Sequence, residues 1–104
     1  MQAQGFVIQG RVLDANNVKD VLPQASVQLL CNDTAFVAGV ATDEDGFFVL
    51  KAKEEGIYKL QISFVGYETL LRKLELKKEN TMIKLGNLLL KQDERLLKEV
   101  QVAG

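Results

Sequence analysis

The clearest structural signal in the sequence is residues 57–65, which read IYKLQISFV and are followed by Gly66. Apolar and polar side chains alternate one by one along this stretch, with Tyr58, Leu60, Ile62 and Phe64 on the apolar side. Alternation with a period of two puts the apolar side chains on one face of a β-strand. We therefore expect a half-buried strand that ends where Gly66 interrupts the pattern.

Similar short runs occur on both sides of this stretch. Strands are predicted over residues 6–13 (FVIQGRVL), 25–31 (ASVQLLC), 36–42 (FVAGVAT), 47–51 (FFVLK), 68–78 (ETLLRKLELKK) and 81–90 (TMIKLGNLLL). Residues 68–78 also fit a helical stripe, and a strand is favoured because every other element is one. Residues 92–99 (QDERLLKE) are the most helix-prone part.

Polar segments separate these runs. Residues 14–20 (DANNVKD) are predicted to be a turn region, and residues 42–46 (TDEDG) are the strongest turn signal, typical of a hairpin. About seven short strands at this spacing, without alternating helices, predict an all-β protein with the architecture of a β-sandwich.

Composition limits the possible functions. The chain has 104 residues, 47% of them hydrophobic, which suits one domain with its own core. Thirteen basic and 14 acidic residues give a net charge of -1, which argues against nucleic-acid binding. The absence of His and the single Cys remove the commonest general base, an internal disulfide and a Cys-rich zinc site. We expect no enzyme activity, no cofactor and no metal.

The carboxylates are the first candidates for chemistry. Asp43, Glu44 and Asp45 form the densest acidic cluster, but too few oxygen ligands follow at regular spacing for a calcium loop, so a turn is favoured. Asp14 and Asp20 flank one loop, and no feature of the sequence pairs them as an acid and a base. These four aspartates and Glu44 therefore define no catalytic site.

Two other residue types are equally unpromising. Cys31 lies on the expected inward face and is interpreted as a small buried hydrophobe, because no His is present to activate it. Ser26 and Ser63 lie on the expected solvent face without a base nearby in the sequence. No catalytic, cofactor-binding or metal-ligating residue is predicted, and any ligand-binding residues stay unknown.

Surface charge and aromatic side chains leave alternatives open. The basic residues Arg72, Lys73, Lys77 and Lys78 would suit phosphate or an anionic lipid, but interspersed Glu68, Glu75 and Glu79 favour a solvated strand face. Among the aromatic residues, Phe48, Tyr58 and Phe64 are expected in the core. The positions of Phe47 and Tyr67 stay open, so a stacking platform for a ligand is an alternative.

Five short motifs occur in an order typical of one family. They are residues 10–14 (GRVLD), 22–27 (LPQASV), 42–48 (TDEDGFF), 56–58 (GIY) and 64–68 (FVGYE). In this order they resemble the carboxypeptidase-regulatory-like domain. That resemblance implies a prealbumin-like (transthyretin-like) antiparallel sandwich of seven strands, with an Ig-like architecture and no catalytic residues.

The end of the chain extends the resemblance. Residues 85–88 (LGNL) and 96–102 (LLKEVQV) are similar to the junction between this domain and the plug of TonB-dependent outer-membrane receptors, or of a related outer-membrane β-barrel family. The segment 31–36 (CNDTAF) is closer to the latter family than to glycan importers. The resemblance implies an N-terminal, non-catalytic accessory domain of a protein for nutrient uptake, on the periplasmic face of the cell outer membrane, with its signal peptide removed.

This resemblance also divides the chain and suggests its partners. Residues 1–5 would be a disordered start or a tag remnant, residues 6–91 the sandwich, and residues 92–104 a linker to the plug. Plug and barrel of the same chain would be the partners, with other periplasmic proteins as further candidates and no nucleic acid. An independent module that binds carbohydrate or peptide is the alternative, and residues 96–102 are a candidate donor for a strand-exchange dimer.

Overall fold

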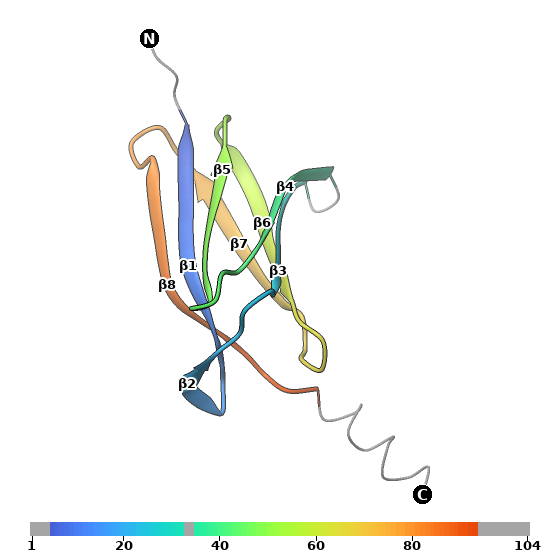
Figure 1. Ribbon diagram of the computed structural model, residues 1–104. Helices are drawn as coiled ribbons and strands as arrows, with labels where there is room; N and C mark the ends of the chain where they lie inside the picture. The colour runs from blue at the N-terminus through green and yellow to red at the C-terminus, as the bar shows by residue number, and fades with distance from the viewer. Residues whose placement is uncertain (1–4, 33–34, 94–104) are drawn as a thin grey trace, which may run out of the picture.

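The computed structural model describes residues 5–32 and 35–93, and this part of the chain forms eight strands and no helix (Figure 1). It therefore contains no helix that could cross a membrane. The strands are β1 (Phe6–Asp14), β2 (Asn17–Val21), β3 (Ser26–Cys31), β4 (Ala35–Ala41), β5 (Phe47–Ala52), β6 (Gly56–Ser63), β7 (Leu70–Leu76) and β8 (Met82–Leu90). Residues 94–104, which include most of the helix-prone segment 92–99 and of the predicted linker 92–104, lie outside the described residues.

The strands form two four-stranded sheets that face each other. In the first sheet β1 is central and pairs with β5, with the short β2 at its end, and with β8. The second sheet has the order β4-β3-β6-β7 and is antiparallel throughout. The predicted β-sandwich is confirmed, with eight strands in place of seven and with β8 parallel to β1.

The additional strand is β2, which begins inside the predicted turn region 14–20 and ends at Val21. The turn itself is shorter, because the Asp14 carboxylate accepts the backbone N–H of Asn16 at 2.6 Å and the chain reverses there. Asn17 then pairs with Asp14, and Val21 with Leu13. The side chains of β2 are mostly exposed, so the strand lacks the alternation by which the others were predicted.

The predicted turn at residues 42–46 forms, but the hairpin expected around it is wrong. The N–H of Gly46 donates to the carbonyl of Asp43, while β4 and β5 on either side belong to different sheets. Gly46 has a φ of 85°, and its carbonyl accepts the N–H of Val12 in β1 at 2.8 Å. The turn is therefore fixed against β1, and the chain crosses from one sheet to the other.

The core lies between the sheets and is built mainly from alternate side chains of β1, β3, β5, β6, β7 and β8. Tyr58, Leu60 and Ile62 are buried as predicted, while Phe64, just beyond the end of β6, is only partly buried. Leu74 and Leu76 are buried in β7, which confirms the strand predicted there.

One polar side chain is fully enclosed in this core. Thr42 is 2% exposed, and its hydroxyl accepts the N–H of Ala25 at 2.9 Å and donates to the carbonyl of Leu22 at 2.5 Å. Backbone bonds also join residue 42 to residues 24 and 25. Thr42 thereby ties the end of β4 to the turn that precedes β3.

Candidate functional site

The most organised polar cluster joins β1 to the last described residues. Asp14, at the end of β1, is 3% exposed, and its Oδ2 accepts a hydrogen bond from the Tyr67 hydroxyl at 2.6 Å. The side-chain amide of Gln92 donates to the same oxygen at 3.2 Å. With the Asn16 N–H on Oδ1, this carboxylate has donors from three separate parts of the chain. We call Asp14, residues 66–68 and residues 91–93 the C-terminal clamp.

Backbone hydrogen bonds complete the C-terminal clamp. The N–H of Glu68 donates to the carbonyl of Lys91 at 2.8 Å, and the N–H of Asp93 donates to the carbonyl of Gly66 at 2.9 Å. Tyr67 and Gln92 lie opposite each other in an antiparallel bridge between them. The segment that follows β8 is therefore held against the body of the sandwich.

The loop before Tyr67 is shaped by its own sequence. Gly66 has a φ of 86°, a conformation that glycine adopts without steric cost. The N–H of Tyr67 donates to the carbonyl of Phe64, and the two rings pack at a centroid distance of 5.6 Å. The position of Tyr67, which the sequence leaves open, is thereby defined: its ring packs on Phe64 and its hydroxyl donates to Asp14.

The hydrogen bond between Tyr67 and Asp14 shifts the pKa values of the two side chains in opposite directions. The hydrogen bond from Tyr67, followed by that from the Asn16 N–H, lowers the pKa of Asp14 below its usual value, against the opposing effect of burial. The same bond to Asp14, together with burial, raises the pKa of Tyr67. At neutral pH the pair is therefore a carboxylate and a phenol, which suits an anchor rather than proton transfer.

The other candidate carboxylates serve separate local roles. Asp20 accepts from the side-chain amide of Asn17, while Oδ1 of Asp43 accepts the N–H groups of Asp45 and Phe47, both at 2.9 Å. Asp43 thus contacts the backbone of Asp45, but no described hydrogen bond joins two of the four carboxylates of Asp14, Asp20, Asp43 and Asp45. Within residues 5–32 and 35–93, no group of three acidic or Cys side chains is placed to hold a metal ion.

The remaining nucleophile candidates lie in the second sheet. Cys31 is a free, partly buried thiol at the end of β3, packed against the core. Ser26 and Ser63 are opposite each other across the β3–β6 pair. The chain contains no His to activate any of them.

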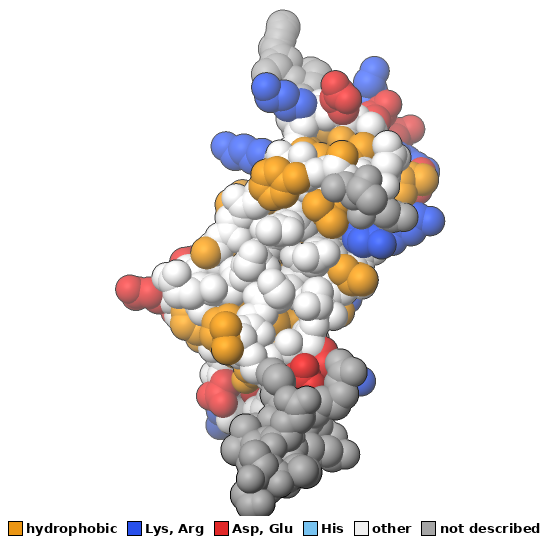
Figure 2. Space-filling model, turned by 90° about the vertical axis from the view of Figure 1, so that its right-hand side faces the viewer, with side chains coloured by type: hydrophobic (Ala, Val, Ile, Leu, Met, Phe, Trp, Pro, Cys, Tyr) orange, Lys and Arg blue, Asp and Glu red, His pale blue; other side chains and the backbone are white. Residues whose placement is uncertain are grey.

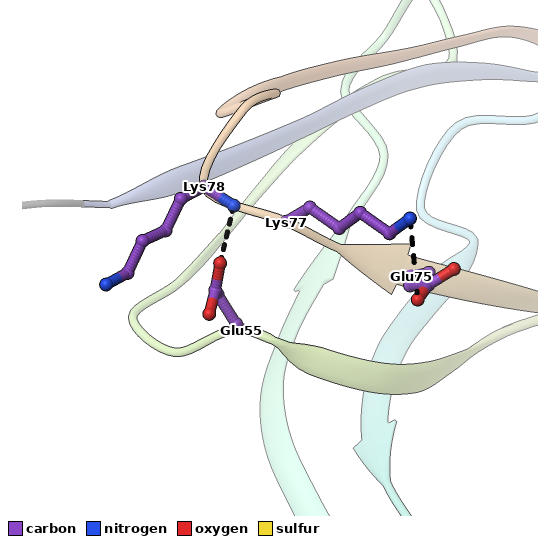
Figure 3. Close-up of polar contacts among 4 residues, drawn as sticks. All are labelled: Glu55, Glu75, Lys77 and Lys78. Atoms are coloured by element: carbon purple, nitrogen blue, oxygen red, sulfur yellow. Dashed lines mark hydrogen bonds and ion pairs between the residues drawn. The ribbon is translucent and has the colours of Figure 1, made fainter.

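The basic cluster is a solvated surface, as the sequence favoured. Arg72, Lys73, Lys77 and Lys78 are all exposed. In Figure 3 the Lys77 ammonium points toward Glu75, at 3.9 Å, whereas Glu55 accepts the backbone N–H of Lys78 at 2.7 Å and the Lys78 side chain extends away. Carboxylates at this end of β7 thus reduce the positive field that phosphate binding would need.

The aromatic side chains do not form a continuous platform. Phe48 and Tyr58 are buried as predicted, and the hydroxyl of Tyr67 is occupied by Asp14. Phe47 is 48% exposed, with the Arg11 guanidinium 4.7 Å from its ring centroid. Phe36 is the other large exposed aromatic among the described residues, but it lies in the opposite sheet.

A shallow hollow accompanies Phe47. It has a volume of about 200 Å³ and is lined by Gln9, Gly10, Arg11, Phe47, Lys84, Gly86 and Asn87. It opens where the β1–β8 register shifts between Gln9 and Arg11, opposite Gly86 with its φ of 74°. No local pattern in the sequence marks this hollow, because the irregular register depends on pairing between distant strands.

The geometry defines a β-sandwich domain whose most developed polar cluster anchors its own chain. A model of the CarboxypepD_reg-like domain matches residues 8–102, and the protein belongs to this family. The resemblance found in the five sequence motifs is thereby confirmed. The search of curated proteins found no match.

Solved structures with the same fold are distant in sequence. The TIE protein of Bacillus anthracis matches with a TM-score of 0.71 and 21% identity, over 85% of this chain and 17% of that one. The pilus 2b backbone protein of group B streptococcus matches with a TM-score of 0.68 and 16% identity, over 88% of this chain and 43% of that one. Chlorocatechol 1,2-dioxygenase from Pseudomonas putida matches with a TM-score of 0.66 and 8% identity, over 86% of this chain and 61% of that one. The chain spans less than two thirds of each of these proteins, and the likeness concerns the fold alone.

Proposed function

We propose that this domain is a non-catalytic connecting module on the periplasmic side of a TonB-dependent outer-membrane receptor, or of a related outer-membrane β-barrel protein for nutrient uptake. The plug and barrel of the same chain would be its direct partners. The proposal combines the family membership with the resemblance of residues 85–88 and 96–102 to the junction before a plug.

The observation that carries the proposal is the route of the chain through the sandwich. β1 and β8 are parallel neighbours, so the start of β1 and the end of β8 lie at opposite ends of the molecule (Figure 1). The C-terminal clamp then fixes residues 91–93 where β8 ends. Tension applied between the two ends would load the β1–β8 hydrogen bonds together in shear, which suits a module placed in series with other domains.

The experiment that tests the proposal is performed on the parent gene and its cells. The reading frame after Gly104 is expected to continue into a plug and barrel strands. An antibody against this domain is expected to detect it in the outer-membrane fraction and to reach it only after the outer membrane is permeabilised. A frame that lacks a plug and a barrel, or a protein found only in the cytosolic fraction, would refute the proposal.

An independent binding module is the second candidate function. The observation in its favour is the hollow beside Phe47, where Arg11 stacks on the ring and donates through Nε to the carbonyl of Asp45 at 2.9 Å. An aromatic face with amide and cationic neighbours suits a carbohydrate or an extended peptide. A glycan array probed with the wild type and with Phe47→Ala tests it, and equal signals from the two proteins would dismiss this site.

A further inference from the structure

The edge strand β4 differs from the other edges of the sandwich. Six of its seven residues are exposed, including Phe36 at 63%, Val37 at 40% and Val40 at 37%. The sequence of the strand is AFVAGVA, without a charged residue or a proline. Exposed edges of this composition are templates for pairing with another strand.

The opposite edge of the same sheet shows the contrast. β7 carries exposed Arg72, Lys73 and Glu75, and charged side chains on an edge oppose pairing with other chains. In the first sheet β5 carries Lys51 and β8 carries Lys84, both exposed. Among the edge strands that the structure describes, β4 therefore lacks the protection that the others have.

The surface around β4 is correspondingly poor in charge. Figure 2 looks onto the side of the molecule where Figure 1 shows β4, and hydrophobic side chains lie across the upper half of this face. Charged side chains in the same view lie mainly near the outline. The centre of the face thus offers mainly uncharged groups to a partner.

The geometry of β4 indicates which part is available for pairing. A bulge lies between the Leu30–Phe36 and Leu29–Ala38 pairs, so Val37 is the extra residue. Bulges disturb pairing locally, but residues 38–41 remain in regular register with β3. This regular half includes Gly39, which carries no side chain to obstruct an approaching strand.

We propose that β4 pairs antiparallel with β4 of a second copy of this chain, so that two second sheets join into one. A neutral strand meets itself across a two-fold axis without like-charge repulsion, whereas a charged partner would find no complement on it. Pairing centred on Gly39 sets Ala38 of one copy opposite Val40 of the other, and both side chains lie on the core side because they pair with Leu29 and Val27.

The expected dimer is weak. A single edge strand buries much less than the roughly 1,200 Å² of stable interfaces, so we expect a dissociation constant between about 10 µM and 1 mM. This inference does not depend on the proposed function, because it concerns the purified chain alone.

Sedimentation velocity of the full chain, up to about 1 mM, tests the proposal. The wild type is expected to shift from monomer to dimer with concentration, and Val40→Lys is expected to weaken the dimer by about tenfold or more. Leu71→Lys, at a position 53% exposed on the opposite edge β7, is the matched control and leaves association unchanged. Circular dichroism checks that each variant is folded.

A charge-swap experiment separates a lost interface from a damaged fold. Val40→Lys mixed with Val40→Glu is expected to associate more tightly than either variant alone. If Val40→Lys is unfolded, Phe36→Lys, at a more exposed position, takes its place. A wild type that stays monomeric at about 1 mM, or a dimer as tight in these variants as in the wild type, would overturn the proposal.

Discussion

Replacing Thr42 with valine removes one buried hydroxyl while keeping the size of the side chain. The hydroxyl serves the N–H of Ala25 and the carbonyl of Leu22, and both of these residues are themselves buried. Valine leaves both backbone groups without this partner in a site that is closed to water. The change therefore tests directly how much a single polar crosslink contributes to the sandwich.

The magnitude follows from the number of groups left unpaired. Each buried donor or acceptor that loses its partner costs about 1–3 kcal/mol, and the additional methyl group of valine offsets less than about 1 kcal/mol. We expect Thr42→Val to lower the free energy of unfolding by roughly 2–4 kcal/mol. For a domain of this size that corresponds to a fall in Tm of about 10–25 °C.

Urea titration followed by far-UV circular dichroism measures the effect, since the chain has no Trp for fluorescence. Thr42→Ser keeps the hydroxyl and is expected to lose only about 1 kcal/mol, for one buried methyl group. Thr69→Val makes the same chemical change at an exposed position and is expected to stay within about 0.5 kcal/mol of the wild type. If Thr42→Val were as stable as the wild type, or Thr42→Ser as unstable as Thr42→Val, the crosslink would not be the cause.

Three further predictions concern glycine, a strained turn and pH. Gly46→Ala is expected to destabilise more than Gly66→Ala in thermal melts, because both have positive φ but only the former places a Cβ 2.8 Å from a β1 carbonyl; equal losses would contradict this. Gln24 has a φ of 66°, so Gln24→Asn is expected to stabilise by up to about 1 kcal/mol in urea titrations, and a destabilised variant would refute it. Because folding lowers the pKa of Asp14, its contribution to the free energy of unfolding is complete above the unfolded pKa of 3.8 and is lost as the pH falls through the folded pKa. Because folding raises the pKa of Tyr67, its contribution is complete below the unfolded pKa of 10.0 and is lost as the pH rises through the folded pKa. Tyr67→Phe is expected to reduce the slope of the unfolding free energy against pH in both the acidic and the alkaline range. Unchanged slopes would show that the Asp14–Tyr67 pair is not their source.

Most strands were predictable because the apolar residues that recur along each strand occupy its buried positions. In β5 and β6, buried and less buried residues alternate along the strand, so the local sequence is enough. β2 gives no such signal, since its five residues are held by one short hairpin and bury little. A strand that is held by backbone pairing alone shows no alternation of apolar and polar residues, so the sequence pattern does not predict it.

Which strands pair was less predictable than where they lie. The TDEDG turn has hairpin chemistry, and its local hydrogen bonds form as that chemistry requires. The strand after it nevertheless pairs with β1, because Gly46 docks on Val12 and directs β5 into the other sheet. Turn residues determine where the chain reverses, whereas tertiary contacts determine which strand the next strand pairs with.

The same limit applies to the C-terminal clamp. From the sequence, Asp14 is only one of several candidate acids, and its partners lie 53 and 78 residues further along the chain. The motif pair that contains Asp14 and Tyr67 marked the family, but spacing in sequence gave no reason for the two to touch. Gln92 carried no signal, because a single amide in a polar segment is common on protein surfaces.

The donors to Asp14 explain why the clamp belongs to the completed fold. A buried carboxylate is costly unless it is hydrogen-bonded, and here the donors are on residues 16, 67 and 92. Only the first is local, so the carboxylate is satisfied when β1, the loop after β6 and the segment after β8 are in place together. Attachment of the C-terminal segment is thus coupled to assembly of both sheets. In a module that joins domains, this coupling would make the geometry of the exit depend on the fold of the sandwich.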